Sequence, residues 1–179
     1  MNHLATSKED ILAASRDLIK ENGWAAVSIR AVASRCSVSA GTIYNYYESK
    51  ADLLSDTIES IWHEIFFHPE DEQIFHDVES CISWIYERLE YGNRQFPGFF
   101  SLHSFGFMRD EKTSGKKRMM KTWGHILNGL CEVLGNDPKV RTDVFDQEFT
   151  EKKFADILFS LILVSMIRQD YDPSSVLML

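Results

Sequence analysis

The sequence predicts an all-α protein, with a small N-terminal group of helices followed by a larger group of longer helices. Apolar residues recur three and four positions apart in every long segment, which is the spacing of one face of an α-helix. Two segments start at a serine followed three residues later by an aspartate, Ser7 with Asp10 and Ser49 with Asp52, as helices with a capping box do. Strand-like alternation, internal repeats and low-complexity tracts do not occur in the 179 residues.

The most informative segment, residues 28–47, predicts two short helices joined by a tight turn. Ser28 and Ser39 each stand at a helix start, where a hydroxyl can accept a hydrogen bond from a free backbone amide. At helical spacing, the second short helix divides into a packing face and an opposite face: Ala40, Ile43, Tyr44 and Tyr47 against Gly41, Thr42, Asn45 and Tyr46. An opposite face of small, hydroxyl and amide groups suits a backbone that must come close to a DNA groove.

Residues 8–62 resemble the DNA-binding domain of TetR-family transcriptional regulators. The resemblance is carried by Ser28, Ile29, Val32, Ala33, the run from Val38 to Tyr47, Ser49, Lys50, Leu53 and Leu54. Ser37 stands where the family usually has a turn glycine, so this serine is expected to adopt a positive φ, which is uncommon for a residue with a side chain. Tyr47 stands where the family usually has phenylalanine, and its hydroxyl needs a hydrogen-bond partner.

The resemblance implies a helix-turn-helix DNA-binding domain over residues 1–49 and a helical effector-binding and dimerisation domain over residues 50–179. It implies phosphate contacts from Ser28, Thr42, Tyr44 and Lys50, and positions nearest the base edges for Arg30, Ser39, Ala40 and Asn45. Gly41 and Tyr46 complete the expected DNA-binding set. The implied partners are double-stranded DNA with a near-palindromic operator, a second copy of the chain, and a small effector of unknown identity. The expected function is transcriptional regulation, as a repressor.

The net charge of −8 argues against a general nucleic-acid-binding protein, and residues 1–60 hold six Lys and Arg against eight Asp and Glu. Arg30, Arg35 and Lys50 are expected to gather around the second short helix, so that binding would depend on where the charge lies. One domain with so few phosphate contacts would hold DNA weakly at physiological salt. The charge pattern therefore also favours a dimer.

A long helix is expected to begin at Lys50, to end before Pro69, and to carry movements of the larger domain to the DNA-binding domain. The other helices are expected at Lys8–Asn22, from about Glu70 to Tyr91 with Gly92 as its stop, at Lys116–Leu134 with Gly135 as its stop, and at Glu151–Arg168. The last of these is apolar nearly all the way round from Ile157 onward, so one of its faces needs a partner subunit. The expected dimer contacts are Phe159, Leu161, Ile162, Leu163 and Met166.

Aromatic and methionine residues of the larger domain suggest a ligand pocket, because pockets combine apolar walls with a few polar groups. Its expected lining is Trp62, Phe66, Phe99, Phe100, Met120 and Trp123, with His103 or His125 as the polar anchor. The effector would then be apolar or aromatic with one polar group. The same aromatic and methionine residues could also form an ordinary hydrophobic core, and in that case the partner of this domain would be a protein and not a small molecule.

The sequence gives no sign of catalysis, of a cofactor or of a metal site. His63 and His68 are five residues apart and point about 140° away from each other on a helix, so they cannot bind one metal ion as an HExxH pair does. The three cysteines are widely spaced and are expected to be buried reduced thiols. No uncharged apolar run reaches ~18 residues and no leader is recognisable, so a cytoplasmic location without membrane association is expected.

Overall fold

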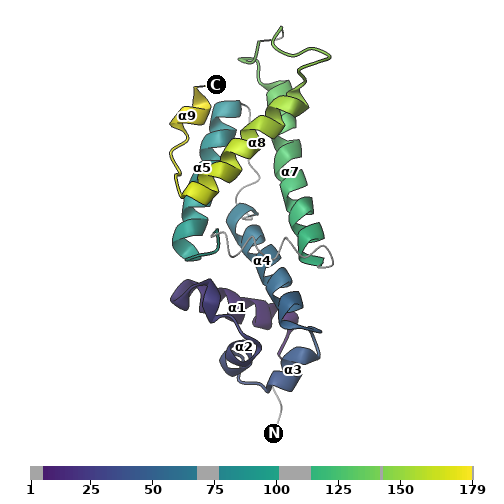
Figure 1. The fold of residues 1–179 in the computed structure, drawn as a ribbon, viewed down its shortest axis with the longest axis vertical. Helices are drawn as coiled ribbons and strands as arrows, with labels where there is room; N and C mark the ends of the chain where they lie inside the picture. Colours follow the sequence, from purple (N-terminus) through teal and green to yellow (C-terminus); the bar gives the residue numbers. More distant parts are fainter. Residues whose placement is uncertain (1–5, 68–76, 101–113, 142, 179) are drawn as a thin grey trace. The chain divides into compact units, whose positions relative to one another are not determined.

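The structure, a computed structural model, describes residues 6–67, 77–100, 114–141 and 143–178. Every regular element in these ranges is a helix, which confirms the predicted all-α class (Figure 1). The elements are α1 (Lys8–Asn22), the 3₁₀ turn η1 (Trp24–Ala26), α2 (Ile29–Arg35), α3 (Ala40–Tyr44), α4 (Lys50–Phe66), α5 (Val78–Gln95), α7 (Ser114–Asn136), α8 (Glu151–Arg168) and α9 (Ser174–Leu177).

The chain forms two compact units, one of residues 1–64 with 92–119 and the other of residues 65–91 with 120–179. Helices α4, α5 and α7 therefore each contribute residues to both units. The functional boundary expected between residues 49 and 50 stays a prediction, because these units are defined by contacts alone. Within the described ranges, none of the helices has the length and apolar content that a bilayer crossing requires.

In the first unit, local capping sets the bounds of α1 as the sequence predicts. The Ser7 hydroxyl accepts a hydrogen bond from the Asp10 amide at 3.1 Å, and the Asp10 carboxylate accepts one from the Ser7 amide at 2.8 Å. The Asp10 carboxylate also accepts a hydrogen bond from the Ser7 hydroxyl at 2.7 Å, and this bond, together with the one from the Ser7 amide, holds the pKa of Asp10 below its usual value. At the other end, Gly23 adopts a φ of 77°, which a glycine tolerates without strain.

The core of the first unit joins α1 to α4 with the chain that follows α5. Its fully buried aliphatic residues include Ile11, Ile19, Val32, Ile43, Leu53 and Ile61. The Trp62 ring contacts those of Phe99 and Phe100 at centroid distances of 5.7 and 5.6 Å, and the Pro97 carbonyl accepts a hydrogen bond from the Trp24 amide at 3.2 Å. The chain after α5 is thereby fixed to the N-terminal helices.

The expected stop of α5 at Gly92 is wrong, since the helix continues to Gln95 with Gly92 buried inside it. Pro97, which lacks a backbone donor, follows soon after the observed end. The start also differs from the expected Glu70: α5 begins at Val78, after Asp77, whose carboxylate accepts a hydrogen bond from the Ser80 amide at 2.7 Å. Residues 68–76 lie outside the described ranges.

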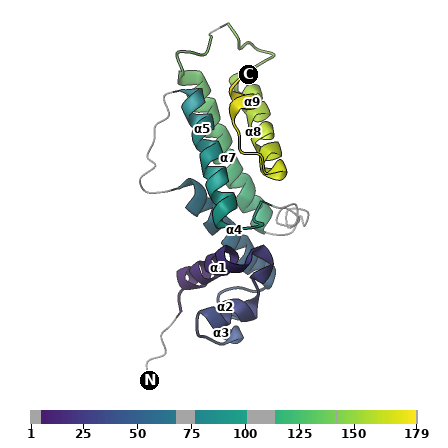
Figure 2. The same cartoon turned by 90° about the vertical axis from the view of Figure 1, so that its left-hand side faces the viewer.

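In the second unit, α8 packs against both α5 and α7 (Figure 2). The Tyr86 and Ser165 hydroxyls share a hydrogen bond of 2.9 Å, which joins α5 to α8. The bounds of α8 are confirmed, with Thr150 as its N-cap. The expected span of α7 is too short, because Gly135 lies inside the helix and Asp137 follows the last helical residue. The carboxylate of Asp137 accepts hydrogen bonds from the amides of Lys139 and Val78, which fixes the chain where α7 ends.

Candidate nucleic-acid interface and cavity

Helices α2 and α3, with the turn between them, form a helix-turn-helix. The Ser28 hydroxyl accepts a hydrogen bond from the Ala31 amide, and that of Ser39 accepts one from the Thr42 amide, both at 3.1 Å, so both predicted caps are confirmed. Ser37 in the turn has a φ of 56°, as expected from its place at a usual glycine position. The turn is closed by a 2.9 Å hydrogen bond from the Val38 amide to the Ala33 carbonyl.

Helix α3 buries Ile43 completely, together with Tyr47 just beyond its end, and leaves its other side open. Gly41, Asn45 and Tyr46 are exposed, while Ala40 and Thr42 are half-buried. The expectation that Tyr44 packs inward is wrong, because its side chain is 54% exposed. Tyr44 lies about 100° round the helix from Ile43, so it falls on the rim of the buried face.

Tyr46 holds the start of the described chain beside α3. Its hydroxyl donates a hydrogen bond to the Thr6 carbonyl, although the side chain as a whole is 41% exposed. The hydroxyl hydrogen is therefore already used within the protein, whereas the ring remains accessible.

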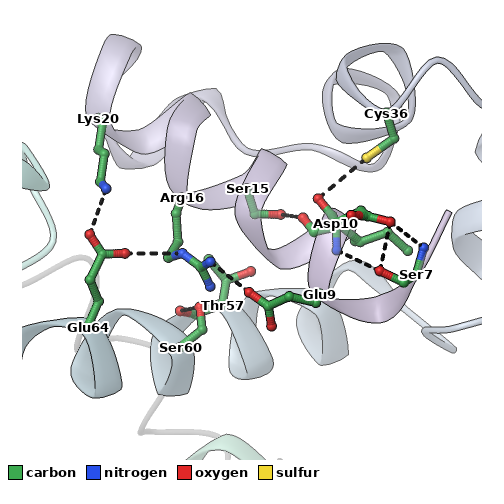
Figure 3. Close-up of polar contacts among 11 residues, drawn as sticks. Ser7, Glu9, Asp10, Ser15, Arg16, Lys20, Cys36, Thr57, Ser60 and Glu64 are labelled. Atoms are coloured by element: carbon green, nitrogen blue, oxygen red, sulfur yellow. Dashed lines mark hydrogen bonds and ion pairs between the residues drawn. The ribbon is translucent and has the colours of Figure 1, made fainter. Parts of the chain in front are cut away.

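Four of the six basic residues before residue 64 are paired with carboxylates. Figure 3 shows Glu64 of α4 between Lys20 and Arg16 of α1, at 2.6 and 3.2 Å. Lys8 likewise pairs with Asp56, whose side chain is only 6% exposed. These pairs connect α1 to α4, and so fix the helix that begins at Lys50 relative to the helix-turn-helix.

The fourth paired residue is Arg35. The expectation that Arg35 contributes unpaired positive charge to the interface is wrong. Its guanidinium donates to both carboxylate oxygens of Glu21, and this bond lowers the pKa of Glu21 and raises that of Arg35. Arg30 and Lys50 are exposed and form no ion pair with any residue that the structure describes. The free positive charge of this region is therefore concentrated in the two basic residues predicted to contact DNA.

A cavity of about 410 Å³ lies in the second unit, between residues of α5, of α7 and of the end of α4. Its lining is Phe66, Phe67, Cys81, Trp84, Ile85, His125, Ile126, Gly129, Leu130, Glu132, Val133 and Asn136. The Phe66 and Trp84 rings meet edge to face at 5.7 Å. Burial raises the pKa of the Cys81 thiol to about 11, so this group is neutral at physiological pH.

The cavity brings together two of the eight residues predicted to line a ligand pocket, Phe66 and His125. Trp62, Phe99 and Phe100 pack on one another in the core of the first unit and are not part of its lining. Met120 is 56% exposed, Trp123 packs against Phe159 at 5.6 Å, and His103 lies outside the described residues. Sequence reasoning missed the α5 side of the cavity, Cys81, Trp84 and Ile85.

The residues that α8 leaves uncovered differ from those predicted for a dimer interface. Ile162 and Met166 belong to the core of the second unit, at 2% and 1% exposure, because they continue the buried stripe that begins at Ala155. Phe159, Leu161 and Leu163 are half-buried. The large apolar side chains exposed on α8 are Ile157, Val164 and Ile167, at 45%, 46% and 51%.

Residues 11–57 match the family model described as bacterial regulatory proteins, tetR family. The HTH-type transcriptional regulator UidR from Escherichia coli is 38% identical to this chain over 48 residues. These residues cover 27% of this chain and 24% of UidR, so the match spans about a quarter of that relative.

Solved structures of regulators share the fold over nearly the whole chain. A TetR transcription regulator from Haloarcula marismortui superposes with a TM-score of 0.68 at 20% identity, covering 89% of this chain and 83% of that one. The transcriptional regulator FadR from Bacillus subtilis, solved in complex with stearoyl-CoA, has a TM-score of 0.63 at 16% identity, with coverages of 94% and 88%. At these identities the likeness shows the fold. The matched family and these neighbours are transcriptional regulators and not enzymes, in agreement with the sequence-based expectation.

Proposed function

We propose that the chain, whose residues 11–57 match the family model of tetR bacterial regulatory proteins, is a homodimeric, DNA-binding transcriptional regulator with a small effector. The observation that carries this proposal is the helix-turn-helix with an open α3 face. Of the basic residues before residue 64, only Arg30 and Lys50 have no ion pair in the described structure; Arg30 lies in α2 of this motif, and Lys50 follows the motif at the start of α4. An acidic protein can bind DNA when its few free cations are placed where the backbone and base edges are reached.

On this proposal, Arg30 and Asn45 read base edges, whereas Ser28, Thr42, Tyr44 and Lys50 contact phosphates. Ser39 and Ala40 lie nearest the bases at the start of α3, and Gly41 allows close approach. Few side chains are available to contact base edges directly, because Ala40 offers only a methyl group and Gly41 offers no side chain. The choice of operator therefore depends mainly on Arg30, whose guanidinium can bond guanine through two donors, and on Asn45.

Arg30→Ala is expected to weaken binding to the operator by about tenfold or more while leaving binding to random DNA nearly unchanged, since a bidentate arginine contact is worth ~1 to 3 kcal/mol. The matched control is Arg35→Ala, which removes the same charge from the same helix but from a residue already paired with Glu21. Fluorescence anisotropy with an operator selected from random DNA measures both variants. Equal losses in the two variants would show that charge, and not base reading, is what Arg30 contributes.

Lys50→Ala is expected to weaken binding to all sequences alike, because a lysine on a phosphate carries no sequence information. Each lost phosphate contact lowers the magnitude of the slope of log K against log salt by about 0.9, so a dimer should lose about two. Anisotropy titrations over a range of salt concentrations give this slope for the wild-type and variant proteins. An unchanged slope would place Lys50 away from the phosphates.

The cavity is the proposed effector site, and its presence favours a small molecule over a protein partner for this domain. Phe66, which lines it, and Lys50, which is proposed to contact DNA, are the two ends of the same helix, α4. An effector acts as an inducer if it binds more tightly to the conformation that fits the operator poorly. A coupling of ~1 to 3 kcal/mol would lower operator affinity between about fivefold and 150-fold, which is the behaviour of a ligand-released repressor.

A further inference from the structure

We propose that the cavity takes a hydrophobic cation, an amine with an aromatic body whose ammonium group lies beside Glu132. This inference rests on the proposed effector role of the cavity and names the chemical class of the ligand. Four observations carry it: the charge of the lining, the arrangement of polar groups along α7, the aromatic rings of the lining, and the charge of the unit that holds the cavity.

The lining contains one carboxylate, Glu132, and no lysine or arginine. The Glu132 side chain is exposed and has no ion-pair or hydrogen-bond partner in the part of the chain that the structure describes. An anion in this cavity would therefore meet a like charge with nothing to compensate it, whereas a cation would meet an unpaired carboxylate. Because Glu132 is exposed, an ammonium beside it stays partly hydrated and avoids most of the desolvation that weakens buried ion pairs.

The polar lining residues lie along one edge of α7. His125, Glu132 and Asn136 fall within about 40° of one another around the helix axis, while Ile126, Leu130 and Val133 lie to one side of them. The Asn136 amide group donates to the Glu132 backbone carbonyl at 2.8 Å, so its own oxygen is left as an acceptor. An edge that offers a carboxylate and an amide oxygen matches an ammonium group, which has only donors.

The remaining lining favours an aromatic body. Phe66, Phe67 and Trp84 present rings, and ring faces also attract a nearby cation. Gly129 widens the space, since a Cβ added there would meet no atom within 4 Å. A volume of about 410 Å³ is ample for a fused two-ring system.

The negative charge of the second unit also favours a cationic ligand. Residues 65–91 and 120–179 hold 16 Asp and Glu against 7 Lys and Arg, a formal charge of −9, whereas the first unit has 11 against 12, or +1. A cavity in so acidic a unit raises the local concentration of cations and repels anions. A phosphate-bearing ligand such as the stearoyl-CoA of Bacillus subtilis FadR would find no basic residue in this lining.

The test uses three probes that share a naphthalene ring: naphthylmethylamine, which is a cation at neutral pH, naphthylmethanol and naphthoate. Isothermal titration calorimetry of the full chain, without DNA, gives their dissociation constants. We expect the amine to bind at least about tenfold more tightly than the alcohol, and naphthoate to bind most weakly. Equal affinities, tighter binding of the alcohol or of naphthoate, or no binding of any probe would overturn the inference.

Glu132→Gln keeps the shape of the side chain and removes its charge, so the amine should bind about fivefold or more weakly while the alcohol is unaffected. Glu87→Gln is the matched control, because Glu87 is exposed on α5 of the same unit and does not line the cavity. Equal effects of the two variants would assign the preference to the charge of the whole unit and overturn the role of Glu132. Operator affinity without ligand is measured in parallel, so failure of the ligand inference remains distinguishable from failure of the proposed DNA binding.

Discussion

Val164→Glu is expected to separate the proposed dimer into monomers and to weaken operator binding by at least about a hundredfold. Val164 is 46% exposed on the single chain and lies on α8 with Ile157 and Ile167, which are also exposed. A carboxylate there stays hydrated in a monomer but would be desolvated in a paired interface. A dimer with two linked DNA-binding domains binds its site roughly 10² to 10⁴ times more tightly than a single domain does, and the variant should lose this gain in affinity.

Light scattering measures the mass of the variant, and anisotropy measures its operator affinity. Val144→Glu is the matched control, because Val144 is similarly exposed, at 43%, in the connection before α8. The control should remain a dimer. A dimeric Val164→Glu protein with full operator affinity would place the interface away from this face of α8.

The second large effect is expected from Gly129→Leu, which should abolish both effector binding and effector-dependent release from the operator. The added side chain would project into open space in the cavity, where even a Cβ meets no atom within 4 Å. Replacing a glycine inside a helix removes a penalty of roughly 0.8 to 1 kcal/mol, so α7 should not be weakened. Operator affinity without ligand is expected to stay within a few-fold of wild type.

Gly124→Leu is the control for this experiment, because Gly124 lies on the same helix, also has open space around it, and does not line the cavity. Titration calorimetry with naphthylmethylamine and operator release by the same probe are the two readouts. If Gly129→Leu binds the amine and responds as the Gly124→Leu protein does, the effector does not occupy this cavity.

Local signals in the sequence predicted the N-terminal region well. Ser7 with Asp10, Ser28 and Ser39 cap the helices they were expected to cap, since these contacts form between residues three apart. The resemblance to one family placed Ser37 at a position that needs a positive φ, and the structure confirms it. Capping and turn chemistry can be read from sequence because they involve only neighbouring residues.

The same local reasoning failed at Gly92 and Gly135, which were expected to end helices and instead lie within them. A glycine only permits a helix to end, and the surrounding structure decides whether it does. At α5 the helix persists until close to Pro97, and at α7 until Asp137, whose carboxylate binds the amide of a residue 59 positions away. Contacts at that separation leave no local pattern in the sequence.

The cavity was misjudged for a related reason. Aromatic density between residues 96 and 108 indicated pocket walls, but Phe99 and Phe100 fill the core beside Trp62. Which apolar stripe becomes core and which encloses a space depends on how helix faces meet, and periodicity does not reveal this. Gly129 was the overlooked signal, because a glycine inside an amphipathic helix often marks a place where space or close approach is needed.

The sequence also did not reveal which charged side chains form ion pairs with each other. Arg35 is close to the turn in sequence, and the sequence predicts that it adds positive charge to the interface together with Arg30 and Lys50. In the structure, Arg35 of α2 pairs instead with Glu21 of α1. This leaves fewer free cations than expected and makes the proposed DNA binding more dependent on two residues.

Selection of bound sequences from random double-stranded DNA tests the central claim most directly, because it shows whether the protein binds a specific DNA site as a dimer with two DNA-binding domains. We predict enrichment of one near-palindromic site whose half-sites are separated by about one helical turn, roughly 34 to 36 Å, or a multiple of it. Enrichment should be clearly weaker with Arg30→Ala and should persist with Arg35→Ala. Recovery of no preferred sequence with the wild-type protein, or of a single half-site without symmetry, would contradict the account.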